Sequence, residues 1–163
     1  MIKDKTVKKW WVIPGTLAVG IVFLSIPAGP NWQNYNPDWV SLVLIYWCFA
    51  TPGRINLTSA WLTGIFLDVV TFGVLGRYAL SKFLIIFVAR RLALRVRIFP
   101  LWQQSLVILV LLLLESLVLI LADFLIIGTK VSYGPVIGVV IGAVLWVPLY
   151  FVLRKIRHWA RLP

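Results

Sequence analysis

The stretch Pro37–Arg54, PDWVSLVLIYWCFATPGR, is apolar in its middle and has a proline near each end. A helix from Pro37 to Thr51 would be about 22 Å long at about 1.5 Å per residue, whereas the hydrocarbon core of a bilayer is about 30 Å thick. Whether this segment crosses a membrane decides the fold, because the orientation of every later segment depends on it. Its length leaves the question open, so the charges on the rest of the chain have to answer it.

The composition is that of an integral membrane protein. Hydrophobic residues make up 61% of the 163 residues, charged residues make up 13%, and the mean hydropathy is +0.97, whereas soluble domains are about 25% charged. The net charge of +11 is carried by basic residues between apolar blocks, which favours orientation in a membrane and argues against binding to nucleic acid. The single cysteine, Cys48, excludes a disulfide framework within the chain and a cysteine metal site.

Six apolar blocks predict a single membrane domain over residues 1–163 that consists only of α-helices. The predicted helices cover about 10–26, 37–51, 57–75, 78–94, 101–127 and 134–153. The links between them are short and leave no room for a soluble domain. The first apolar block follows a basic head, but it is longer than the core of a typical signal peptide, so we expect a retained anchor.

The distribution of lysine and arginine indicates that the short segment spans the membrane. If it spans and the amino terminus is cytoplasmic, 13 basic residues lie inside and three, Arg77, Lys82 and Lys130, lie outside. If it does not span, the later loops flip and the count becomes 7 inside against 9 outside. The sequence therefore predicts a six-transmembrane-helix bundle with both termini in the cytoplasm. Bilayer thinning, helical extension or shielding inside the bundle would accommodate the short helix.

Three acidic residues lie inside apolar blocks: Asp68, Glu115 and Asp123. Because an isolated charge in hydrocarbon is costly, such residues are paired, protonated or in contact with water. Together with Arg77 they form a candidate intramembrane polar network. We favour structural pairing with Arg77, Lys82, Lys130 or hydroxyl groups over contact with a ligand or partner, and both over proton transfer.

The last apolar block carries small residues at a spacing of four, in a stripe that consists of Gly134, Gly138, Gly142 and Trp146. Four residues advance a helix by about 400°, so these positions lie along one face. Such a stripe allows close approach of a neighbouring helix. We favour a neighbour within this chain over a helix of a partner.

A basic segment at residues 90–97 provides a candidate cytoplasmic patch for anionic lipids or for docking of a cytosolic partner. Its members are Arg90, Arg91, Arg95 and Arg97. The only histidine, His158, lies in the basic tail, and neither a metal-ligand spacing nor a phosphate-binding glycine loop is present in the sequence. We therefore expect no enzymatic activity, no metal and no cofactor.

Several short motifs follow one another along nearly the whole chain. They are Pro37-x-Trp39, Tyr46-Trp47, Pro52-x-Arg54, Gly64-x-x-x-Asp68, Leu75-Gly76 with Ala79-Leu80, Leu101-Trp102-Gln103-Gln104 and the basic tail. In this order the chain resembles the MreD family of the bacterial rod-shape system, and its proteobacterial branch most closely.

The resemblance implies a non-enzymatic protein of the bacterial inner membrane that takes part in the rod-shape complex, or elongasome. It implies binding to MreC, association with RodA and its class B penicillin-binding transpeptidase, and an indirect link to MreB. The family's fold is similar to the substrate-binding subunits of energy-coupling-factor transporters. A small-molecule-binding or transport subunit is therefore an alternative function, in which Asp68, Glu115 and Asp123 would line a ligand pocket.

Overall fold

The computed structural model describes residues 9, 11–26, 29, 35–51, 53–128 and 135–162. Within these residues the chain forms six α-helices and no strand, which confirms the predicted all-helical class there. Two of the described helices, α6 and α7, are long and apolar enough to cross a membrane, while α1, α3 and α4 are apolar but shorter. The helices are α1 Val12–Ser25, α3 Trp39–Ala50, α4 Leu57–Val70, α5 Arg77–Val96, α6 Leu101–Ile127 and α7 Pro135–Trp159.

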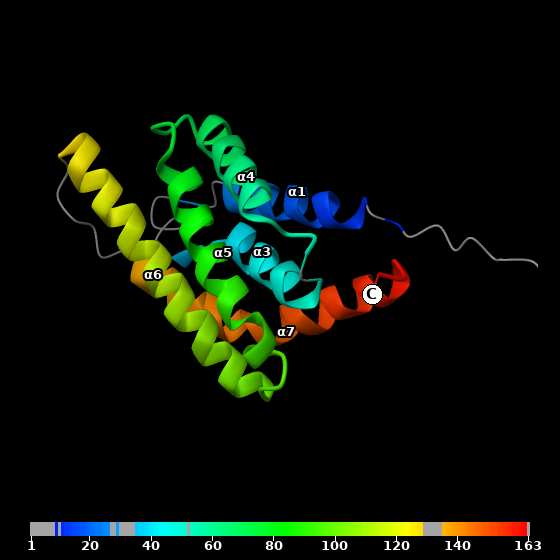
Figure 1. Cartoon of the computed structure of the whole chain (residues 1–163). Helices are drawn as coiled ribbons and strands as arrows, with labels where there is room; N and C mark the ends of the chain where they lie inside the picture. The colour runs from blue at the N-terminus through cyan, green and yellow to red at the C-terminus, as the bar shows by residue number, and fades with distance from the viewer. Residues whose placement is uncertain are drawn as a thin grey trace, which may run out of the picture.

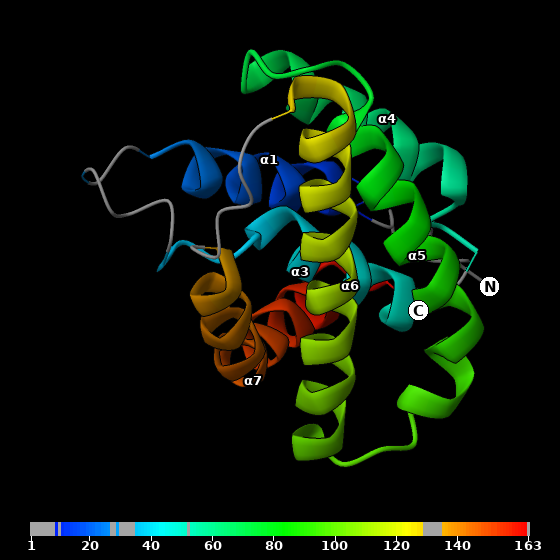
Figure 2. The same cartoon turned by 90° about the vertical axis from the view of Figure 1, so that its left-hand side faces the viewer.

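The short helix α3 is the central element of the fold (Figure 1). Helices α1, α5 and α7 pack directly against α3, α4 packs on α5, and α6 packs on both α5 and α7. Figure 2 shows α5 and α6 side by side, with α3 behind them. The other helices therefore surround the segment on which the fold depends.

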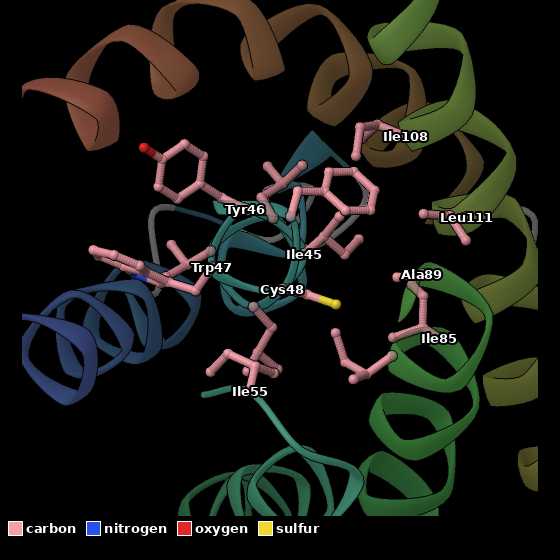
Figure 3. Packing of buried hydrophobic residues seen from close by; sticks show 14 of the residues in the cluster. Ile45, Tyr46, Trp47, Cys48, Ile55, Ile85, Ala89, Ile108 and Leu111 are labelled. Carbon is pink, nitrogen blue, oxygen red and sulfur yellow. The ribbon is translucent and has the colours of Figure 1, made fainter. Parts of the chain in front are cut away.

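All residues of α3 from Val40 to Phe49 are buried. In Figure 3, which looks along this helix, Tyr46 points towards α7, Trp47 towards α1 and Cys48 towards α5. The Trp47 indole Nε1 donates to Thr16 Oγ1 of α1 at 2.9 Å. Of the three predicted ways to accommodate a short spanning helix, shielding inside the bundle agrees with this packing.

Two helix ends differ from the prediction. Helix α4 ends at Val70 and not at Leu75, because a turn follows in which Phe72 and Gly76 have positive φ angles of 50° and 99°. Helix α7 continues to Trp159 and not only to residue 153, since arginine and lysine are good helix formers even where the apolar pattern stops. The other described ends lie within two residues of the predicted ones.

The start of α1 and the ends of α3, α5 and α7 gather on one side of the molecule, which we call the Arg97 end. The Lys9 backbone N–H donates to the Ala160 carbonyl at 3.4 Å. Arg97 and Arg157 both donate to the Ala50 carbonyl oxygen, at 3.0 Å and 3.5 Å. These contacts bring together chain segments that the charge count predicts to be cytoplasmic.

Candidate functional site

Lys82 lies in the second turn of α5, and its side chain is completely buried, at 0% exposure. An ammonium group has three N–H donors. Lys82 Nζ has three acceptors: Asp38 Oδ2, Ser41 Oγ at 2.7 Å and Glu115 Oε1 at 2.5 Å. Lys82 therefore joins α5 to the start of α3 and to α6, with an acceptor for each of its donors.

Ser41 and Glu115 complete this group, which together with Asp38 and Lys82 we call the Lys82 cluster. Ser41 Oγ donates to Glu115 Oε1 at 2.7 Å while it accepts from Lys82. The Glu115 side chain is only 3% exposed, and its Oε2 has no hydrogen-bond partner among the described residues. One ammonium group thus faces two carboxyl groups in a buried place.

Asp38 also caps α3. Its Oδ1 accepts from the Ser41 backbone N–H at 3.0 Å, while its Oδ2 contacts Lys82. A carboxylate at this position satisfies a free N–H group and interacts favourably with the helix dipole. Neither Asp38 nor Ser41 was among the predicted site residues. An acidic residue directly before an apolar helical run is a helix-start signal that could have identified Asp38.

Asp68, near the end of α4, caps the neighbouring helix α5. Its Oδ1 accepts from the Tyr78 N–H at 2.8 Å, and its Oδ2 accepts from the N–H groups of Gly76 at 2.8 Å and Ala79 at 3.3 Å. The N–H groups of a first helical turn have no partner within their own helix. Among the described residues, backbone amides satisfy this carboxylate, and not the basic or hydroxyl side chain that we expected; one of the expected partners, Lys130, lies outside the described residues.

Gly64 makes the contact between α4 and α5 close enough for this cap. A Cβ atom at position 64 would lie 2.6 Å from the Tyr78 carbonyl oxygen and 2.7 Å from the Ala79 nitrogen, closer than real Cβ contacts. The pattern Gly64-x-x-x-Asp68 thus places a small residue where the helices cross and a carboxylate one turn later, where α5 begins.

Arg77 and Asp123 form a separate ion pair between α5 and the end of α6. Arg77 Nε lies 2.8 Å from Asp123 Oδ1, and Nη2 donates to Oδ2 at 2.8 Å. Their side chains are 27% and 28% exposed. This pair is more open to its surroundings than the Lys82 cluster and should contribute less to stability.

The predicted network of Asp68, Arg77, Glu115 and Asp123 is therefore three separate contacts. All three contacts involve the first part of α5. Every acidic residue of the described chain forms an ion pair or a hydrogen bond with Arg77, with Lys82 or with free backbone amides in this part of α5. We call these contacts together the α5 start. No group of three His, Cys, Asp or Glu side chains within the described ranges is placed to hold a metal ion. The arrangement fixes α3, α4 and α6 relative to α5.

The described members of the glycine stripe lie inside the protein, while Gly134 lies outside the described residues. Gly138 and Gly142 are buried in α7. A Cβ atom at position 142 would lie 2.9 Å from Leu112 Cδ1 of α6. Trp146 is fully buried, and its ring centroid lies 6.3 Å from that of Phe49 in α3. Gly142 and Trp146 therefore face neighbours within this chain.

The four arginines of the candidate basic patch divide into two groups. Arg90, Arg91 and Arg95 are exposed along the last turns of α5, and the Arg91 guanidinium lies 4.6 Å from the centre of the Phe87 ring. Arg97 instead donates from Nε to the Phe49 carbonyl and from Nη2 to the Ala50 carbonyl. Arg97 thus caps the end of α3, so the patch is not uniform.

The sequence as a whole is related to proteins that determine cell shape. Residues 4–156 match the family model of the rod shape-determining protein MreD. The chain is 24% identical over 161 residues to the rod shape-determining protein MreD of Haemophilus influenzae, and the match covers 99% of each chain. No solved structure matches the chain. The expected likeness to the substrate-binding subunits of energy-coupling-factor transporters therefore stays a prediction.

Proposed function

The chain belongs to the MreD family of rod shape-determining proteins, and we propose that it is a scaffold of the rod-shape complex in the bacterial inner membrane. In this role it binds MreC and works with RodA and its class B penicillin-binding transpeptidase. It thereby supports lateral peptidoglycan synthesis, and its link to MreB is indirect. MreD is not a known enzyme family, and the proposed role is non-enzymatic.

The observation that carries this proposal is the family match, which extends over nearly the whole chain. The contacts of the α5 start support a structural role for the acidic residues. Asp68 accepts three backbone N–H groups, Asp123 pairs with Arg77, and Glu115 accepts from Lys82 and Ser41. Acids used in this way hold helices together, whereas a ligand site would need carboxylate oxygens directed into an open pocket.

We further propose that the chain crosses the membrane six times, with both termini in the cytoplasm. With this topology 13 basic residues lie on the cytoplasmic side and three on the other side, as the positive-inside rule requires. The contact between Lys9 and Ala160, near the two ends of the chain, also supports it. In this orientation the exposed Arg90, Arg91 and Arg95 face anionic lipid headgroups. Each basic residue near such a surface contributes about 1 kcal/mol to membrane attraction.

Depletion of the protein in its own bacterium tests the proposal. Loss of a rod-complex scaffold should round the cells because lateral wall synthesis is disturbed. An affinity-tagged chain, purified from native membranes, should bring with it a single-span protein that has a periplasmic domain, as MreC would be.

The alternative function, a small-molecule-binding or transport subunit of the energy-coupling-factor type, has no support from the family match. The same purification distinguishes the two functions. Co-purification with a pair of ATPases, together with loss of vitamin uptake and unchanged cell shape, would refute the scaffold role.

A further inference from the structure

A pocket of about 360 Å³ lies between α3, α5, α6 and α7 at the Arg97 end. One part of its lining is aromatic and comes from Tyr46, Phe49, Trp146 and Tyr150. Another part carries the guanidinium groups of Arg97 and Arg157. Because Arg97 caps the end of α3 while Asp38 caps its start, the pocket lies at the opposite end of α3 from the Lys82 cluster.

The pocket concentrates positive charge. Both guanidinium groups reach the Ala50 carbonyl oxygen, at 3.0 Å from Arg97 and 3.5 Å from Arg157. The carboxyl end of a helix carries only about half a negative charge, whereas the two guanidinium groups carry two positive charges. The positive charge at this place is therefore in excess. In the part of the chain that the structure describes, neither arginine forms a salt bridge, and the acidic residues are all held by the α5 start. The pocket is therefore suited to attract an anion.

Trp146 adds an unused hydrogen-bond donor to the lining. Its side chain is fully buried, yet its indole Nε1 has no partner among the described residues. Buried donors in folded proteins are nearly always paired, and an acceptor bound in the pocket that Trp146 lines is a candidate partner for this group. Gln104 differs, because its amide nitrogen already donates to the carbonyl oxygens of Val96 and Phe99.

We propose that this pocket binds the phosphate group of an anionic amphiphile. The phosphate contacts the guanidinium donors of Arg97 and Arg157 that the Phe49 and Ala50 carbonyl groups leave free, and the apolar part of the ligand lies against the aromatic side. Free inorganic phosphate would use only the basic side, whereas an amphiphile uses both. The inference does not depend on the proposed protein partners of the chain.

The experiment compares three probes on the full chain in dodecyl maltoside micelles, with thermal unfolding followed by circular dichroism. The probes are oleoyl lysophosphatidic acid, monooleoylglycerol, which lacks the phosphate, and inorganic phosphate, which lacks the acyl chain. We expect a saturable rise in Tm with the first probe only, within the same concentration range. Equal potency of monooleoylglycerol or of inorganic phosphate would overturn the proposal.

Two variants locate the effect in the pocket. Arg157→Met should raise the half-saturating concentration of oleoyl lysophosphatidic acid by about tenfold or more, because a charge-assisted contact is lost. Arg154→Met is the matched control, since Arg154 is exposed on the same helix and does not line the pocket. An equal effect of both variants would indicate general charge attraction and would overturn the site.

Trp146→Phe provides a second, independent variant that keeps a six-membered aromatic ring and removes the indole N–H together with the five-membered ring. It should also weaken the phosphate-dependent rise in Tm, whereas Trp159→Phe, at an exposed position outside the pocket, should not. Because the readout is the shift caused by the probe, a lower starting Tm of the variant does not hide the result. An unchanged shift in both Arg157→Met and Trp146→Phe would refute the pocket.

Discussion

Replacing Lys82 by methionine removes the central cation of the Lys82 cluster while keeping an unbranched side chain of similar length. Asp38, Ser41 and Glu115 then each lose the donor that Lys82 Nζ supplies. Removing one partner of a buried ion pair costs about 3–5 kcal/mol, because the remaining charge stays buried without compensation. Total stabilities of folded domains are about 5–15 kcal/mol, so we expect a large loss. The measurement is unfolding of the purified chain in mixed micelles with increasing sodium dodecyl sulfate.

Two further variants separate this mechanism from a general loss of packing. In the triple variant Asp38→Asn, Lys82→Met, Glu115→Gln the cluster is neutral, and asparagine remains a good helix cap. This triple variant should be more stable than Lys82→Met alone. The changes in unfolding free energy are then not additive, as expected for residues in contact. Arg77→Met breaks the more exposed pair with Asp123 and should cost about 1 kcal/mol or less. Equal losses for Lys82→Met and Arg77→Met, or no recovery in the triple variant, would refute the reasoning.

Three other predictions use the same purified chain or the intact cell. Gly64→Ala should lower the unfolding midpoint because its Cβ would press on the backbone of α5, whereas Gly15→Ala, with open space around it, should raise the midpoint slightly; equal shifts would contradict this. Asp68→Asn should cost about 1–3 kcal/mol, since its amide group would turn N–H donors towards the donors of α5, and wild-type stability would contradict the cap. In a cysteine-free background, Tyr35→Cys should react with an impermeant thiol reagent in spheroplasts and Ile98→Cys should not; the reverse pattern would overturn the topology.

The approximate positions of the six described helices could be predicted because they follow from apolar blocks. Helix ends were predicted well where a change in apolar character coincides with a local boundary signal, as at Leu101, where α6 starts directly after Pro100. They were missed where the two differ. The apolar run after Val70 is not helical, because contacts with α5 fix a turn there, and the basic run after Leu153 continues α7.

The acidic residues of the site could be found from the sequence only when they interrupt apolar blocks. Asp68, Glu115 and Asp123 were identified for this reason, since each would be costly in hydrocarbon without a partner. The partner of each acid depends on how helices cross, which local patterns do not specify. Asp38 was missed because it lies at the edge of a polar link, where a carboxylate gives no sign of burial.

The length of α3 gives the polar residues at its two ends a common physical reason. At about 1.5 Å per residue, its 12 residues extend about 18 Å, well short of a hydrocarbon core of about 30 Å. If α3 crosses the membrane, its free N–H and carbonyl groups lie where no water can satisfy them. Asp38, which Lys82 pairs, caps the start of the helix, and Arg97 and Arg157 donate to carbonyl groups at its end. The Asp38 carboxylate and the two guanidinium groups therefore also complement the helix dipole. In that case the surrounding segments supply Lys82, Arg97 and Arg157 to the ends of a helix that is too short to reach the membrane surfaces by itself.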